Sequence, residues 1–148
     1  MGSFILANHI LHIADRTKTD VTLLKLQKTL YYAQGYFLRF FSEPAFKDEI
    51  LHWAYGPACP SVHFAYSHYG AEPLSPKQGL RLEPMPIDKG RLLEKVTEAC
   101  FAQPTKDLIR MTCQETPWLY TKLHDEIPIQ SIRAYFEDND PLKLLRRN

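Results

Sequence analysis

Cys59 and His63, four residues apart, are side chains whose types and spacing could do chemistry. A thiolate beside an imidazole can act as a nucleophile, and two such side chains on one helical face can hold part of a metal ion's ligand shell. His9 and His12 have a similar spacing. A structural zinc site needs four ligands, and no second pair follows either one at a recognisable spacing. We therefore expect no metal and no cofactor.

The sequence favours a structural role for the Cys59 thiol over a catalytic one. A free cysteine between two prolines is most simply a small buried apolar residue. No nucleophile elbow surrounds Ser61, and the glycine-rich phosphate-binding motifs do not occur. Cys59, Cys100 and Cys113 are odd in number and far apart, which predicts free thiols. We expect a protein that is not an enzyme, with a thiol-dependent enzyme using Cys59 and His63 as an alternative.

An amphipathic helix is predicted over residues 22–41, TLLKLQKTLYYAQGYFLRFF. Its apolar residues recur with a helical period, at Leu23, Leu26, Leu30, Ala33, Phe37 and Phe41. Gln27 and Gln34 lie two turns apart near the middle of this stripe, so both are expected to be buried. Because a buried amide without partners is costly, each glutamine should hydrogen-bond backbone that has no regular partners. The expected segment is Tyr55-Gly56-Pro57.

The opposite face of this helix combines basic and aromatic residues, namely Lys25, Lys28, Tyr32, Tyr36 and Arg39. Gly35 leaves a flat spot beside them where another backbone could come close. Two interpretations stay open for this face. It could bind a partner, or it could be solvated with its tyrosines at the edge of the core.

The composition is that of an ordinary globular protein without a strong overall charge. The 148 residues fit one domain, with 45% hydrophobic and 24% charged residues. Lys and Arg number 18 against 17 Asp and Glu, so the net charge of +1 gives no global attraction to nucleic acid or anionic membranes. A local nucleic-acid interface using Lys25, Lys28, Tyr32, Arg39 and Arg146-Arg147 is disfavoured. The chain has neither a membrane-length apolar run nor a signal-peptide pattern, which predicts a cytoplasmic protein.

Helical patterns dominate the remaining chain. Periodicity and capping residues predict helices near residues 4–15, 61–70, 88–102, 105–116 and 128–136, and a last one from residue 140. Proline and glycine predict a rigid loop over 53–60. The expected fold class is mainly α, a single compact multi-helix domain over residues 1–148 with at most a small, short-stranded β element around 50–54 and 80–82. Residues 71–90 should be an exposed connector, and 139–148 a C-terminal tail.

Three stretches of the sequence together resemble a known family. The first runs from Lys25-Leu26-Gln27-Lys28 to Leu30-Tyr31-Tyr32-Ala33-Gln34-Gly35. The second contains Trp53, Tyr55-Gly56-Pro57 and Pro60-Ser61-Val62. The third contains Thr112, Glu115 and Pro117-Trp118, followed near the end by Ile132 and Tyr135-Phe136. In order and spacing they resemble the Panacea domain, also called the SocA-like antitoxin domain, of bacterial and phage toxin-antitoxin systems. The resemblance covers roughly residues 5 to 138.

This resemblance implies an antitoxin that binds and neutralises a cognate protein toxin encoded nearby. A family relative similar to a proteolytic adaptor gives delivery of the toxin to a ClpXP-type protease as an alternative. The shared motifs are interpreted as determinants of the fold: Lys25, Gln27, Lys28, Tyr31, Gln34, Trp53, Tyr55, Gly56, Pro57, Pro60, Pro117 and Trp118. Recognition would then lie on the connector 71–90 and on the outer helix face, with Lys25, Lys28, Tyr32, Tyr36 and Arg39 as candidate partner-binding residues.

Two positions depart from the family's pattern. Cys113 stands where the family often has histidine, which argues against a catalytic or metal-binding histidine there. Ala58-Cys59 replaces the usual pair of valines after Gly-Pro, which changes packing more than chemistry.

Overall fold

The expected mainly helical fold with one small sheet is confirmed. The structure is a computed structural model that describes residues 1–77 and 80–145. Its elements are α1 (Ser3–Arg16), α2 (Leu23–Phe41), β1 (Leu51–Trp53), β2 (Gly56–Ala58), α3 (Pro60–Tyr66), the 3-10 helix η1 (Ser67–Tyr69), α4 (Ile87–Phe101), α5 (Thr105–Cys113), α6 (Thr116–Leu119) and α7 (Ile129–Asp138). Within these described ranges, no helix has the length and hydrophobicity needed to cross a bilayer.

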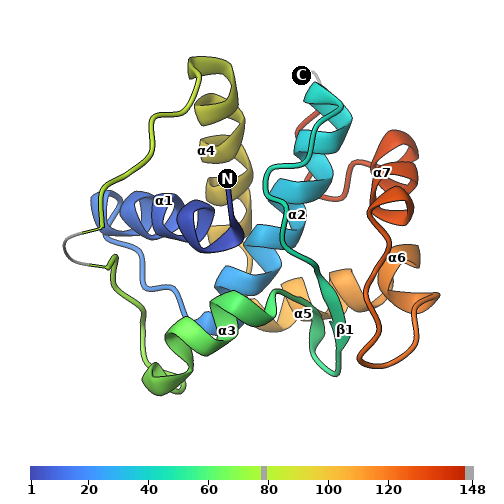
Figure 1. The fold of residues 1–148 in the computed structure, drawn as a ribbon, viewed down its shortest axis with the longest axis horizontal. Helices are drawn as coiled ribbons and strands as arrows, with labels where there is room; N and C mark the ends of the chain where they lie inside the picture. The colour runs from blue at the N-terminus through green and yellow to red at the C-terminus, as the bar shows by residue number, and fades with distance from the viewer. Residues whose placement is uncertain (78–79, 146–148) are drawn as a thin grey trace.

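Helix α2 forms the centre of the molecule, with α4 on one side and α7 on the other (Figure 1). The hydroxyl of Thr22 caps its start by accepting a hydrogen bond from the Lys25 amide. The helix ends at Phe41, and the next residue, Ser42, caps it in a left-handed conformation with a φ of 55°. Every residue from Lys25 to Leu38 is buried. The core therefore surrounds α2 on all sides, whereas an amphipathic pattern predicts one buried face.

The small sheet is a hairpin extended on one side by a later segment. β1 and β2 pair antiparallel, with Leu51 opposite Ala58. On the other side of β1, the His52 amide donates to the Asp125 carbonyl at 2.9 Å, and the His124 amide donates to the His52 carbonyl at 2.7 Å. Hydrogen bonds on both sides keep β1 from being an open sheet edge.

Two expected elements are absent from the described chain. Residues 80–82 form no strand, because their alternation is short and no neighbouring strand pairs with them. Residues 140–145 form a turn instead of a helix, since the Asp140 carboxylate accepts hydrogen bonds from the Leu144 and Leu145 amides. The rest of the expected tail helix, residues 146–148, lies outside the described residues.

In the described parts of the connector, residues 71–77 and 80–90, many side chains are exposed, and the segment is anchored to the rest of the fold at several points. Leu74 is buried, and its amide donates to the Val21 carbonyl at 2.8 Å. The Lys77 amide donates to the side-chain oxygen of Asn8 at 3.1 Å. The last residues of the connector, from Ile87 to Gly90, form the start of α4, and Asp88 lies in the first turn of this helix.

Gly35 permits the close approach of α2 and α7. A Cβ at this position would lie 2.2 Å from an atom of the Phe136 ring, which occupies the spot where the sequence suggested another backbone. The Phe136 ring also meets the rings of Tyr31, Tyr32 and Tyr36 edge-on. The glycine thus lets an aromatic cluster close around the middle of α2.

We predict that Gly35→Ala destabilises the protein by about 1–3 kcal/mol, because the added methyl group forces the Phe136 ring out of its packed position. Chemical denaturation measures the change in the free energy of unfolding. Gly90→Ala in α4 is the matched control, since a Cβ there meets no atom within 4 Å. This control should gain about 0.5–1 kcal/mol from helix propensity. Equal stability of the two variants would contradict the packing argument.

Candidate functional site

Gln27 lies in the interior and holds the backbone at the end of the hairpin. Its Nε2 donates to the Cys59 carbonyl at 2.9 Å, and its Oε1 accepts from the Cys59 amide at 2.7 Å. The one side chain thus satisfies both polar groups of a residue that lies between β2 and α3. The contact falls just beyond the expected segment 55–57.

Gln34 is also buried, but it binds a different segment from the one expected. Its Oε1 accepts from the Ala45 amide at 2.7 Å, and its Nε2 donates to the Phe46 carbonyl at 3.0 Å. The expectation that Gln34 holds the 55–57 loop is therefore wrong. After Ser42 the chain runs back beside α2 towards the hairpin (Figure 1). Gln34 lies two helical turns after Gln27, so it meets this returning segment instead of the hairpin.

Lys28 supplies the contact to the 55–57 loop. Its Nζ donates to the Pro57 carbonyl at 3.0 Å, and the side chain is only 1% exposed. It packs against Gly56, whose φ of 113° is a left-handed conformation that favours glycine. Burial lowers the pKa of Lys28 to about 8, and nearby Cys113 and Cys59 partly oppose this shift.

The expected exposed face of α2 is instead covered, so this expectation is wrong. Lys25, Lys28, Tyr32 and Tyr36 are buried and Arg39 is half-buried. Their polar tips bind elements that lie later in the chain and cover them. The Lys25 Nζ donates to the Phe101 carbonyl at 3.3 Å, and Arg39 donates to the Phe136 and Glu137 carbonyls. The Tyr36 hydroxyl donates to Asp140 at 2.5 Å.

Glu115 is a buried carboxylate that two tyrosines hold. The hydroxyls of Tyr31 and Tyr32 donate to its two oxygens at 2.9 and 2.7 Å. Burial raises the pKa of Glu115 to about 7, although both hydrogen bonds favour the charged form. The sequence marked Glu115 as a motif residue without indicating this role. Its only sequence signal was its place beside Pro117-Trp118.

Lys28 and Glu115 could in principle act as an acid and a base, but they are not arranged as a catalytic pair. No ion pair joins them in the described structure, and each is held by neutral groups. Two surface pockets lie near the start of α4, one lined by Met85 and Phe46 and the other by Phe40 and Leu92, and neither Lys28 nor Glu115 lines them. Their shifted pKa values therefore follow from burial in the folded core, and the geometry places no substrate against them.

Cys59 and His63 do not form a hydrogen-bonded reactive pair among the described residues. The Cys59 thiol is buried, and burial raises its pKa, which disfavours the thiolate. The His63 ring instead packs edge-on against the Trp53 ring at 5.0 Å. No group of three or more His, Cys, Asp or Glu side chains gathers in the described ranges in a way that could hold a metal ion.

The second and third motifs meet at the hairpin. The rings of His52 and Trp118 stack with their centroids 3.9 Å apart, and Trp118 Nε1 donates to the Trp53 carbonyl at 3.0 Å. Pro60 is the first residue of α3 and Pro117 is the second residue of α6, and a missing amide is tolerated in the first turn of a helix. These motif residues join α3, the hairpin and α6 into one unit.

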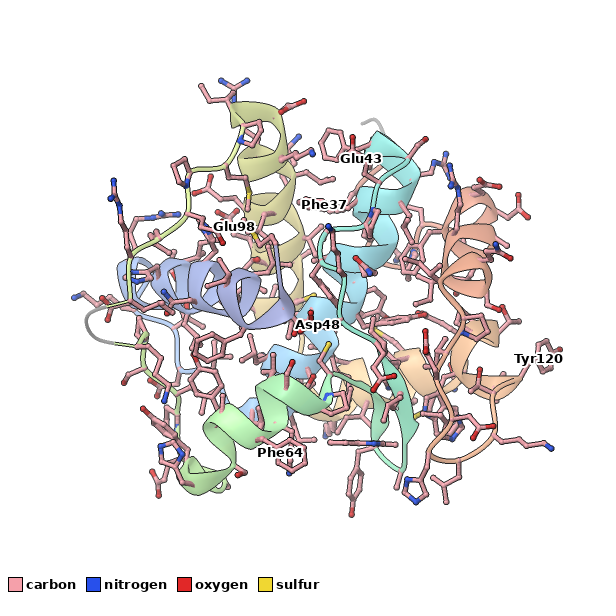
Figure 2. The ribbon with its side chains drawn as sticks, in the orientation of Figure 1. Phe37, Glu43, Asp48, Phe64, Glu98 and Tyr120 are labelled. Atoms are coloured by element: carbon pink, nitrogen blue, oxygen red, sulfur yellow. The ribbon has the colours of Figure 1, made fainter. Side chains whose placement is uncertain are left out.

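Large side chains project from the surface near this unit. Tyr55 at the hairpin tip, Phe64 on α3 and Tyr120 after α6 are 65%, 75% and 84% exposed. Figure 2 shows Phe64 and Tyr120 pointing outward from well-separated parts of the molecule. Isolated exposed aromatic residues of this kind are common at protein-protein interfaces.

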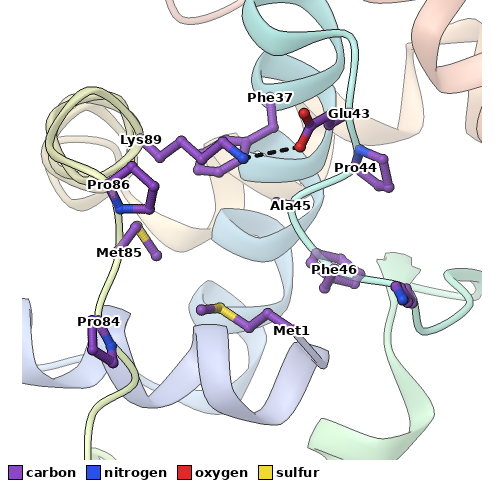
Figure 3. Close-up of a pocket in the computed structure, with 11 residues that line it drawn as sticks. Met1, Phe37, Glu43, Pro44, Ala45, Phe46, Pro84, Met85, Pro86 and Lys89 are labelled. Atoms are coloured by element: carbon purple, nitrogen blue, oxygen red, sulfur yellow. Dashed lines mark hydrogen bonds and ion pairs between the residues drawn. The ribbon is translucent and has the colours of Figure 1, made fainter.

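The opposite end of the molecule carries a pocket of about 300 Å³ (Figure 3). It lies between the start of α4 and the chain that follows α2, with Met85 and Pro86 on one side and Ala45 and Phe46 on the other. An ion pair of 2.9 Å between Lys89 and Glu43 spans it. No cluster of catalytic groups gathers in the described lining of this pocket, which combines apolar side chains with the charged residues Glu43, Lys47 and Lys89.

The fold and these sites define a helical domain whose motif residues hold together its own backbone. Residues 26–119 match the family described as antitoxin SocA-like, Panacea domain, and the chain belongs to this family. The match covers the motif residues from Leu26 to Trp118, and Lys25, Ile132 and Tyr135-Phe136 lie outside it. Searches of curated proteins and of solved structures found no match. Family membership supports an antitoxin role, a toxin as the general type of partner, and a non-enzymatic function.

We predict that Gln27→Leu lowers the free energy of unfolding by about 1–3 kcal/mol, because it leaves the Cys59 amide buried without a partner and removes one of the two hydrogen bonds to the Cys59 carbonyl, which also accepts from the His63 amide. Urea denaturation provides the measurement. Gln130→Leu, on the exposed face of α7, is the control and should change stability by less than about 0.5 kcal/mol. A Gln27→Leu protein as stable as the control would show that the glutamine is dispensable.

Glu115 should make stability fall as pH rises. Its pKa is about 7 in the folded protein and 4.5 for the free side chain, so the folded state holds the proton more tightly between these values. We predict that this difference removes up to about 3 kcal/mol of stability between about pH 4.5 and 7.5, and that Glu115→Gln abolishes the loss. Denaturation curves at a series of pH values test this. Glu98→Gln, which removes an exposed carboxylate, should keep the wild-type slope.

Proposed function

We propose that this protein neutralises a cognate protein toxin, encoded nearby, by binding it directly in the cytoplasm. The observation that carries the proposal is the match of residues 26–119 to an antitoxin family. The geometry is consistent with a binding function because the titratable groups of the interior, Lys28 and Glu115, are occupied by hydrogen bonds within the fold. The residues that contact the toxin are therefore expected on the surface.

Several surface regions are candidates for such contacts. The connector 71–90 stays a candidate, as the sequence suggested, because many of its described residues are exposed. Exposed aromatic residues near the hairpin, including Tyr55 and Phe64, add the side chains that dominate binding energy in many interfaces. The buried face of α2 supplies no such contacts in this structure, because α7 and the segment that follows it cover it.

The proposal predicts that the neighbouring gene product stops growth when expressed alone, and that co-expression of this protein restores growth. Because neutralisation is by complex formation, the two proteins should also co-purify through a tag on either one. Growth curves and affinity purification provide the measurements. A neighbouring product that is harmless, or one that is toxic and neither rescued nor bound, would contradict the proposal.

Delivery of the toxin to a ClpXP-type protease is the alternative mechanism and gives a different result in the same strains. In that case rescue depends on the protease, and the toxin disappears faster when this protein is present. Under direct neutralisation the toxin persists in the complex, and rescue is the same in a strain without the protease. Immunoblots of toxin after a translation block distinguish the two.

A further inference from the structure

The end of α2 and the start of α4 lie at the same end of the molecule (Figure 1). Residues of these two helices, together with Leu144, line a second groove. Its volume is about 320 Å³, which suits one or two large apolar side chains. Phe40 and Phe41 of α2, Leu92 of α4 and Leu144 form its apolar lining. None of these four residues takes part in the polar network around Lys28 and Glu115.

Ring contacts hold the two phenylalanines of the apolar lining, and Phe40 is accessible. The Phe40 side chain is 46% exposed, and its ring stacks on the buried Tyr36 ring with centroids 6.4 Å apart. The Phe41 ring is fixed by an edge-on contact with Phe37, and the Lys89 Nζ lies 5.7 Å from its centroid. A preformed aromatic surface loses little entropy when a partner binds.

The edge of this groove is positively charged. Arg91 and Lys95 are exposed on α4, one helical turn apart, and no ion pair or hydrogen bond engages their side chains within the described chain. The third α4 cation there, Lys89, is already paired with Glu43. Asp88 is the one acidic residue in the described lining, and its Oδ1 accepts a hydrogen bond from the Lys89 amide.

We propose that this groove binds an acidic amphipathic helix of the toxin, an inference that rests on the proposed function. Apolar side chains of the helix fill the space over Phe40 and Leu92, as in other helix-in-groove complexes. Carboxylates one turn apart on the helix pair with Arg91 and Lys95, which are themselves about 6 Å apart along α4. Arginine adds geometric specificity because its guanidinium can bind a carboxylate through two parallel hydrogen bonds.

The same features argue against a nucleic acid as the occupant. Binding to a phosphate backbone draws on many cations, whereas the described lining of this groove offers Arg91 and Lys95 beside Asp88. Its apolar lining would also gain little from a duplex backbone. An acidic peptide with apolar anchors uses both parts of the groove.

The test uses the full chain and, as the probe, the neighbouring gene product purified from the complex. We expect the charge reversal Arg91→Glu/Lys95→Glu to weaken toxin binding at least about 10-fold, measured by calorimetry, and Phe40→Ala to weaken it several-fold. Lys106→Glu/Lys122→Glu is the matched control, since it reverses two exposed charges on α5 and after α6. This control should bind like wild type. Circular dichroism melting curves verify that each variant is folded.

A charge swap identifies the toxin side of the contact. Replacing pairs of Asp or Glu residues one turn apart on the toxin by Lys should restore binding to Arg91→Glu/Lys95→Glu at one pair. The inference is overturned if the folded double variant binds like wild type, if Phe40→Ala has no effect, or if no swap restores binding. It is also overturned if duplex DNA binds the wild type and the double variant loses that binding. Failure of the wild type to bind any toxin would instead refute the proposed function.

Discussion

The fold depends on the burial of polar side chains along α2. Gln27, Lys28 and Gln34 satisfy the backbone of two segments, 45–46 and 57–59, that have few regular partners of their own. The hairpin strands are only three residues long, too short to hold this part of the chain by sheet pairing alone. Each side-chain bond therefore replaces a backbone partner that secondary structure would otherwise supply.

The interior tolerates the side chains of Lys28 and Glu115 because each has its own kind of hydrogen-bond partner. The Lys28 ammonium group binds a carbonyl, and the Glu115 carboxylate accepts from two phenols. Burial shifts both groups towards their neutral forms, lowering the pKa of Lys28 to about 8 and raising the pKa of Glu115 to about 7. Shifted pKa values often indicate catalysis, but here burial accounts for both shifts.

The sequence predicted the positions of the helices better than it predicted which of their faces are buried by tertiary packing. Helical periodicity identified α2 and the inward position of Gln27 and Gln34, because those properties depend on spacing alone. The same pattern could not show that Tyr32 and Tyr36 would be buried. Their hydroxyls find acceptors in Glu115 and Asp140, 83 and 104 residues away in sequence, and only tertiary folding brings such distant groups together.

The groove beside α4 has no signal in the sequence. Its apolar and basic residues come from α2, α4 and the segment after α7, and only tertiary packing brings them together. At Leu80-Arg81-Leu82, by contrast, the sequence has a local strand pattern but the structure has no strand. A strand also needs a neighbouring strand to pair with, and the local pattern does not show whether one is present.

The motif residues of α2 lie in the interior, whereas the residues proposed to contact the toxin lie on the surface. Side chains such as Gln27 and Lys28 cannot change without leaving buried backbone groups unpaired, which costs stability. Phe40, Arg91 and Lys95 carry no such constraint, because their exposed atoms serve no backbone partner in the described structure. Substitutions there can alter the shape and charge offered to a toxin while the hydrogen-bonded core keeps the fold. One scaffold can in this way serve chemically different partners.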